Sequence, residues 1–311
     1  MLENVKVRKS LFLVLKVGVI LLVLFLFIQK IKGIKVGDFE TVSIQYFTPL
    51  IIVIALFFLN WYFEWLKWKH TLFIVIPTSN IKNITSSLLS GITTGVITPN
   101  RIGNFIGRAL YYPMRQRLSI TIGTLYGNFA QFTATVFFGL VALTLYPIEL
   151  NSIVPYTLLS LAILLILFYF LIPSLIKKLL LLITKKHNIT NTLIQLKKIL
   201  QALKFKLLYF STFRYLVFVF QYALLFYALG EAVQINLIAG ICVMYLISTL
   251  TPSLFFGKLL IRETTALYVL GTLIENPAVI IVSSLSLWVL NLGIPSLIGA
   301  YFLWKTKIEK T

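Results

Sequence analysis

The sequence predicts an all-α polytopic membrane protein with six membrane-crossing helices and two re-entrant helical hairpins arranged as an inverted repeat. Composition, the lengths of the apolar stretches and a motif found once in each half lead to this prediction. Of the 311 residues, 59% are hydrophobic and 12% charged, against about 45–50% and about 25% in soluble domains. No stretch is polar for long enough to fold in water by itself, so we expect residues 1–311 to form a single membrane domain.

Six apolar stretches are long enough to cross about 30 Å of hydrocarbon, which takes roughly 20 helical residues. In chain order they are residues 11–28, 47–65, 118–146, 156–172, 207–229 and 278–304. The first follows a basic N-terminus, as the apolar region of a signal sequence does. Because no small-residue cleavage site follows it, we expect this segment to be retained as the first span.

The basic residues predict the orientation of these spans. Lys6, Arg8 and Lys9 precede the first span, residues 174–206 hold eight lysines and no acid, and the tail after Trp304 is also basic. Loops rich in lysine and arginine stay on the cytoplasmic side, so we expect both termini and residues 174–206 to be cytoplasmic. With 28 basic against 9 acidic residues, we interpret the excess as topology signalling and attraction to anionic lipid rather than to nucleic acid.

The basic segment 174–206 allows two interpretations. Its residues Leu196, Ile199, Leu200 and Leu203 recur at helical spacing with lysines between them, which is typical of an amphipathic helix lying on an anionic bilayer. A solvated loop with a short helical stretch fits equally well.

Two further apolar segments, residues 86–99 and 239–252, are too short to cross a membrane alone. Lengths of 10–14 residues suggest re-entrant segments, and irregular backbone at membrane depth occurs only within protein or beside a wet cavity. Both segments end in Thr-Pro, which is followed by a glycine four or five residues later and by an arginine five residues after that glycine. The matched residues are Thr98, Pro99, Gly103 and Arg108 in the first copy and Thr251, Pro252, Gly257 and Arg262 in the second.

The two copies divide the chain into half-repeats, residues 1–150 and 151–311. In the predicted topology the spans before the two motifs run in opposite directions, so the halves are inverted relative to each other. Transporters built from inverted repeats bind their substrates between the halves, at interrupted helices. We therefore expect the two hairpins to carry the functional site.

The residue types in the motif suit a phosphate. Proline breaks the helix, glycine permits close backbone approach, and a helix that restarts after the break directs free N–H groups toward an anion. Arginine adds a planar fork for bidentate contacts with phosphate. Because an arginine within the membrane is costly, it marks a functional candidate by default, and this criterion selects Arg101, Arg108, Arg214 and Arg262.

Glu263 directly follows Arg262, and adjacent helical residues point about 100° apart. We therefore expect Glu263 to pair with Arg108 or Arg214, which leaves a net positive charge for an anionic ligand. Structural ion pairing, or extension of the arginines to an interface, is the alternative interpretation. With one cysteine and two histidines, we expect no disulfide within the chain and no metal site, and no cofactor or catalytic motif is present.

The stretches TPNRIGNFIGRA (98–109) and TPSLFFGKLLIRETTAL (251–267) resemble the lysylphosphatidylglycerol synthase transmembrane-region, or flippase-like, family of integral membrane proteins. Pro252, Gly257, Arg262 and Glu263 match the family's proline, glycine cluster and Arg-Glu pair, although here the cluster is reduced to one glycine. The resemblance implies lipid handling in a bacterial-type cytoplasmic membrane. We expect no lysyl transfer by this polypeptide, because 311 residues leave no room for the family's soluble transferase domain.

The leading functional hypothesis is therefore a non-enzymatic protein that binds or translocates a lipid. An anionic headgroup or a polyprenyl phosphate would sit between the two hairpins. A membrane-embedded transferase acting on a lipid-linked substrate is one alternative, and a non-transporting accessory subunit is another. A transferase would need a general base, for which Glu64 and Glu263 are the only acids near membrane depth.

Overall fold

The chain forms a bundle of helices. The computed structural model describes residues 17–18, 21–98, 101–148, 150–183, 187–252 and 257–305, with side chains described outside 176–197. Every regular element within these ranges is helical. Five helices are long and apolar enough to cross a membrane, namely Thr48–Val75, Met114–Leu143, Ile153–Leu175, Lys198–Ala228 and Pro277–Lys305. The predicted all-helical membrane class is thus confirmed.

The elements follow one another with short connections. A helix at Leu21–Ile31 comes first. The labelled helices are then α2 (Val36–Glu40), α3 (Thr48–Val75), α4 (Ile81–Val96), α5 (Gly103–Ala109), α6 (Met114–Leu143), α7 (Ile153–Ile183), α8 (His187–Ala228), α9 (Ile235–Leu250), α10 (Gly257–Val269), α11 (Pro277–Trp288) and α12 (Ile294–Lys305). Residues 11–16 and 19–20 of the predicted first span, 11–28, lie outside the described residues, and its described part belongs to the short apolar helix Leu21–Ile31. The described structure therefore accounts for five of the six expected crossings.

The last span contains an irregular turn that the sequence analysis did not predict. A five-residue π-helical turn, Val289–Gly293, separates α11 from α12. Turns of this type are rare and occur frequently at functional sites. Here the turn includes the buried side chain of Asn291, which takes part in the site described below.

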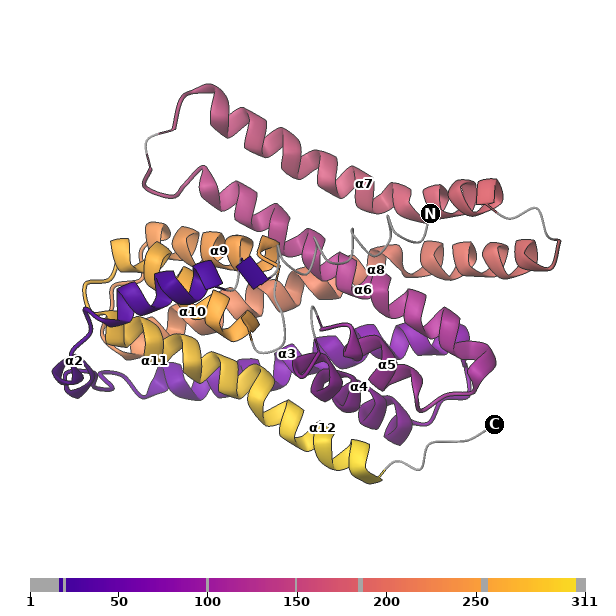
Figure 1. The fold of residues 1–311 in the computed structure, drawn as a ribbon, viewed down its shortest axis with the longest axis horizontal. Coiled ribbons are helices and arrows are strands. Elements are labelled where there is room, and N and C mark those ends of the chain that lie inside the picture. The colour runs from indigo at the N-terminus through magenta and orange to yellow at the C-terminus, as the bar shows by residue number, and fades with distance from the viewer. Residues whose placement is uncertain are drawn as a thin grey trace.

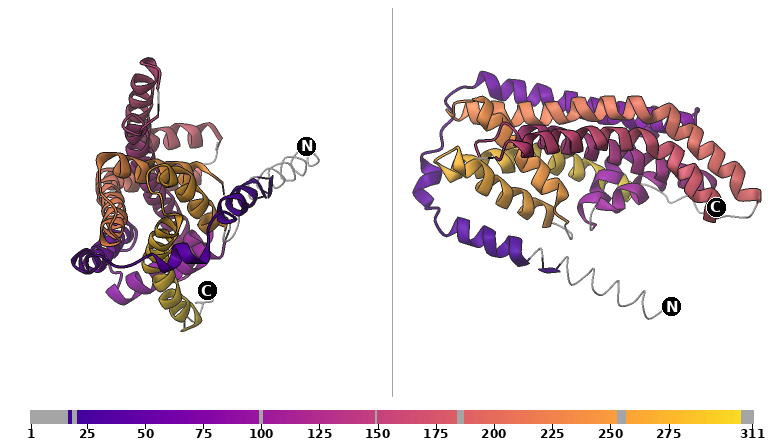
Figure 2. Two further views of the ribbon diagram at one scale, coloured as in Figure 1. Left: turned by 90° about the vertical axis from the view of Figure 1, so that its left-hand side faces the viewer. Right: turned by 90° about the horizontal axis from the view of Figure 1, so that it is seen from above.

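The two predicted hairpins correspond to pairs of short helices. Helix α4 packs against α5, and α9 packs against α10. The first helix of each pair has 16 residues, about 24 Å at 1.5 Å per residue, which is less than the hydrocarbon thickness. The α4–α5 and α9–α10 pairs lie toward opposite ends of the bundle, with α3, α6 and α8 running between them (Figures 1 and 2).

The described parts of segment 174–206 continue two long helices, while residues 184–186 and the side chains of 176–197 lie outside the described structure. Helix α7 extends to Ile183 and α8 begins at His187, so the helical spacing does indicate a helix. Leu200 and Leu203, however, are fully buried in a cluster with Tyr126 of α6 and Tyr169 of α7. At Leu200 and Leu203 the helix therefore packs on protein, whereas the predicted contact of the rest of the segment with a bilayer stays a prediction.

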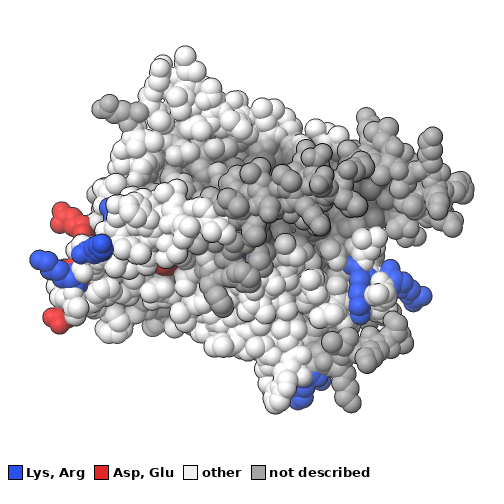
Figure 3. All heavy atoms as spheres, in the orientation of Figure 1, with Lys and Arg blue, Asp and Glu red and all other residues white. Residues whose placement is uncertain are grey.

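Charge is distributed unevenly along the bundle. In the face seen in Figure 3, acidic side chains appear at one end, whereas lysines and arginines appear at both ends. Exposed Lys30, Lys32 and Glu40 lie in or just before α2, whereas exposed Arg115 begins α6 and exposed Lys305 ends α12, at the opposite end of the bundle (Figure 1). A basic end opposite a mixed end is the pattern that the positive-inside rule predicts.

Candidate functional site: a cationic cavity between the helix pairs

A cavity of about 300 Å³ lies between the two helix pairs and the central helices. Its lining includes six cationic side chains and, among the described residues, a single carboxylate. The cations come from α3, from the first helix pair and its connection, from α8 and from the second pair. They are Lys67, Arg101, Arg108, Arg214, Lys258 and Arg262, and the carboxylate is Glu64.

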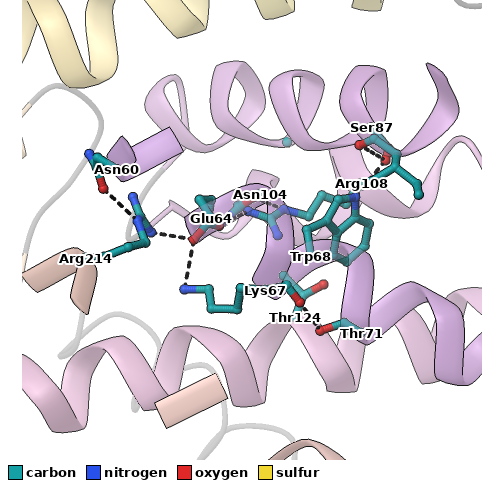
Figure 4. Close-up of polar contacts among 12 residues, drawn as sticks. Asn60, Glu64, Lys67, Trp68, Thr71, Ser87, Asn104, Arg108, Thr124 and Arg214 are labelled. Carbon is teal, nitrogen blue, oxygen red and sulfur yellow. Dashed lines mark hydrogen bonds and ion pairs between the residues drawn. The ribbon is translucent and has the colours of Figure 1, made fainter. Parts of the chain in front are cut away.

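Glu64 is the centre of this charge cluster (Figure 4). It is 5% exposed and lies on α3. Its Oε1 accepts a hydrogen bond from Arg108 Nη2 at 2.7 Å, and its Oε2 pairs with Lys67 Nζ at 2.9 Å and with Arg214. Three helices far apart in sequence, α3, α5 and α8, are thereby joined through one carboxylate.

The side chain of Arg108 makes a hydrogen bond and a contact with an aromatic ring in addition to its ion pair with Glu64. Its Nε donates to Asn104 Oδ1 at 2.8 Å, and its guanidinium lies 4.8 Å from the ring centre of Trp68. Trp68 is fixed in turn by a 2.9 Å hydrogen bond from Nε1 to Ser87 Oγ. Gly91 makes room for this arrangement, since a Cβ there would lie 2.5 Å from Arg108 Cγ.

A series of hydrogen-bonded amide side chains holds Arg214 in place. Asn60 accepts from Arg214 Nε at 2.9 Å and donates to Asn291 Oδ1 at 2.8 Å. Asn291 donates to Gln221 Oε1 at 3.1 Å, and Gln221 donates to the carbonyl of Val53 at 3.1 Å. Because these amides are buried and mutually bonded, they orient Arg214 toward Glu64. The π-helical turn supplies Asn291, the link between α3 and α8.

The first Thr-Pro motif shapes the α4–α5 pair. Thr98 Oγ1 accepts a hydrogen bond from Gly103 N at 2.7 Å and donates to the carbonyl of Thr94 at 2.7 Å. Gly103 lies so close to α4 that a Cβ would collide with the Thr94 carbonyl group. Arg101 borders the cavity with a positive φ of 58°, a left-handed conformation that is uncommon outside glycine. Pro99 lies outside the described residues.

In the second motif, cationic side chains border the cavity. Lys258 donates to the carbonyls of Ser248 and Thr251, near the C-terminus of α9. Arg262 Nη2 donates to the carbonyl of Ser284 at 3.1 Å. Thr251 and Pro252 follow α9 without lining the cavity, and Gly257 begins α10.

The expectation that Glu263 pairs with Arg108 or Arg214 is wrong. Its Oε1 accepts from Ser284 Oγ at 2.7 Å, and Oε2 has no partner among the described residues. Glu263 lines a second, largely apolar cavity of about 470 Å³. The successive positions on α10 point Arg262 and Glu263 into different cavities, as the 100° rotation per residue requires.

The sequence analysis missed the central role of Glu64, although a signal for it was present. Asn60, Glu64, Lys67 and Thr71 recur at intervals of four, three and four residues in an otherwise apolar span, which places them on one helix face. All four side chains are buried. A polar stripe of this kind in a membrane helix indicates a face that points into the bundle.

Comparisons of the chain with known protein families, with curated proteins and with solved structures found no match. The described residues form an all-helical protein with five helices that could cross a membrane and a cationic cavity lined by the short helix pairs and the central helices.

Proposed function

We propose that this protein binds a lipid with an anionic headgroup in the cationic cavity and translocates such lipids across the membrane. The observation that carries the proposal is the lining, in which one carboxylate faces six cations within a bundle of apolar helices. Uncompensated charge in a low-dielectric setting is costly, and an anionic headgroup would supply the missing counter-charge through forked hydrogen bonds.

We also propose that residues 11–28 form a sixth crossing and that the α4–α5 and α9–α10 pairs are re-entrant hairpins of an inverted repeat. Support comes from the 16-residue lengths of α4 and α9 and from the positions of the two pairs toward opposite ends of the bundle. Membership of the flippase-like family and residence in a bacterial-type cytoplasmic membrane, with both termini inside, belong to the same proposal. They rest on the two Thr-Pro motifs and on the basic segments.

The site chemistry favours binding over transferase activity. A transferase would need a carboxylate free to accept a proton. Glu64, the one carboxylate among the described lining residues, is instead engaged by three cations. Glu263, the other candidate base, has an oxygen without a partner among the described residues, but it lines the second, largely apolar cavity and not this one.

The test compares purified protein and variants in two assays, mass spectrometry of co-purified lipid and scrambling of fluorescent phospholipid in proteoliposomes. We expect Arg262→Ala to reduce both binding and scrambling. Arg262→Lys should impair them nearly as much, because lysine keeps the charge and loses the fork. Arg115→Ala, an exposed arginine outside the cavity, serves as the matched control. Unchanged binding and scrambling in both Arg108→Ala and Arg262→Ala would contradict the proposal.

A further inference from the structure

The cavity has two groups of cations that differ in how they are neutralised. Lys67, Arg108 and Arg214 share the carboxylate of Glu64. The other three, Arg101, Lys258 and Arg262, have no ion-pair partner among the described residues. Glu263 is close to Arg262 but lines the second cavity. Within the cationic cavity, the described residues supply no carboxylate for this second group, so an anionic ligand would be its counter-charge there.

Among the described residues, the hydrogen-bond acceptors of Lys258 and Arg262 are neutral, and one donor of Arg262 has no acceptor. Lys258 contacts backbone carbonyls. Arg262 donates one guanidinium N–H to a carbonyl and lies 5.8 and 5.9 Å from the ring centres of Tyr222 and Tyr245. Its Nε is buried and has no hydrogen-bond partner among the described residues. A buried donor without a partner costs free energy unless an acceptor arrives.

The formal charge of the lining indicates how much negative charge the ligand carries. Six cations and one carboxylate leave an excess of five positive charges. Residues 99–100 and 253–256, which lie outside the described structure and adjoin the two motifs in sequence, are Pro, Asn, Ser, Leu, Phe and Phe, none of which is ionisable. A phosphodiester headgroup contributes one negative charge, whereas a phosphomonoester carries about −1.5 to −2 at pH 7 and three acceptor oxygens.

We infer that the cavity selects a phosphomonoester or diphosphate group and rejects an aminoacylated, cationic headgroup. This inference rests on the proposed function for the lipid part of the ligand. A cationic headgroup needs an acid to receive its ammonium, and the one carboxylate described in the lining is already shared by three side chains. A terminal phosphate in the cavity can instead lie against the guanidinium of Arg262 and the ammonium of Lys258, on α10, and beside Arg101 of the first pair, because all three residues line the cavity.

The experiment measures binding of defined lipids to the full chain in nanodiscs of phosphatidylcholine. Phosphatidic acid, phosphatidylglycerol and lysylphosphatidylglycerol are each added at the same mole fraction, and native mass spectrometry counts the bound lipid. We expect phosphatidic acid to bind more tightly than phosphatidylglycerol by on the order of tenfold, because it offers additional charge-assisted hydrogen bonds. Lysylphosphatidylglycerol should bind least.

Two variants test whether Arg262 is responsible for the preference for phosphatidic acid over phosphatidylglycerol. Arg262→Gln should lower the preference for phosphatidic acid over phosphatidylglycerol toward unity. Arg115→Gln, outside the cavity, should leave it unchanged. Because Arg262 has no ion pair in the described structure, its replacement leaves the Glu64 cluster intact, and gel filtration checks that the fold is kept.

A competition experiment with soluble phosphate compounds distinguishes a lipid ligand from a free phosphate ester. Glycerol 3-phosphate or pyrophosphate is added as a soluble competitor of phosphatidic acid. We expect either one to displace the bound lipid only weakly. Effective competition would support the phosphate class and overturn the lipid part of the proposed function. Equal or tighter binding of phosphatidylglycerol or lysylphosphatidylglycerol would overturn the inference while leaving lipid binding in place. Absence of binding by all three lipids would overturn both.

Discussion

Replacing Glu64 by glutamine perturbs the one carboxylate described in the cavity lining. At an effective dielectric constant of about 20, each ion pair of Glu64 with Arg108 or Lys67, at 2.7 and 2.9 Å, is worth roughly 6 kcal/mol before desolvation. Desolvation cancels much of this, and removing one partner of a buried pair costs about 3–5 kcal/mol in practice. We expect Glu64→Gln to lower the free energy of unfolding by about 3 kcal/mol, since glutamine keeps one acceptor oxygen.

The free energy of unfolding can be measured by steric trapping or by titration with sodium dodecyl sulfate in mixed micelles. Glu275→Gln is the matched control, because Glu275 is exposed in a loop, and we expect a change of less than about 0.5 kcal/mol there. A double variant, Glu64→Gln with Arg214→Gln, should recover part of the loss because it removes an unpaired cation. A loss below about 1 kcal/mol in Glu64→Gln would refute the view that this carboxylate neutralises the buried cluster.

Three further outcomes test the fold and the site. Gly103→Ala should destabilise the protein by about 1–3 kcal/mol, because a Cβ there collides with α4, whereas Gly37→Ala meets open space and should change thermal stability little. Asn291→Ala should cost about 1–3 kcal/mol in the same unfolding assay, because it leaves buried amides without partners; an unchanged midpoint would contradict that role. Cysteines introduced at exposed Lys82 and Gln234 should react with a membrane-impermeant maleimide from opposite faces of the membrane, and labelling from the same face would contradict the inverted arrangement.

Composition and pattern were sufficient to predict the class of this protein. In a chain with 59% hydrophobic residues, backbone groups in lipid must be satisfied within the segment, and helices do this locally. All five membrane-length helices begin or end within a few residues of a predicted span, and the two short apolar segments largely coincide with α4 and α9. The cost of a buried charge similarly selected Arg101, Arg108, Arg214 and Arg262, all of which border one cavity.

Only the tertiary structure decided which side chains pair with or pack against one another. Glu64 joins arginines 44 and 150 residues away, and no local pattern predicts which acid meets which cation across such distances. Leu200 and Leu203 look alike in sequence whether they face lipid or protein, and only the packing of α8 on α6 and α7 places them in a core. For the same reason Glu263 was expected to pair with Arg108 or Arg214, whereas it accepts a hydrogen bond from Ser284. Helical periodicity is a property of the local chain, whereas the neighbour that each face meets depends on how distant helices pack.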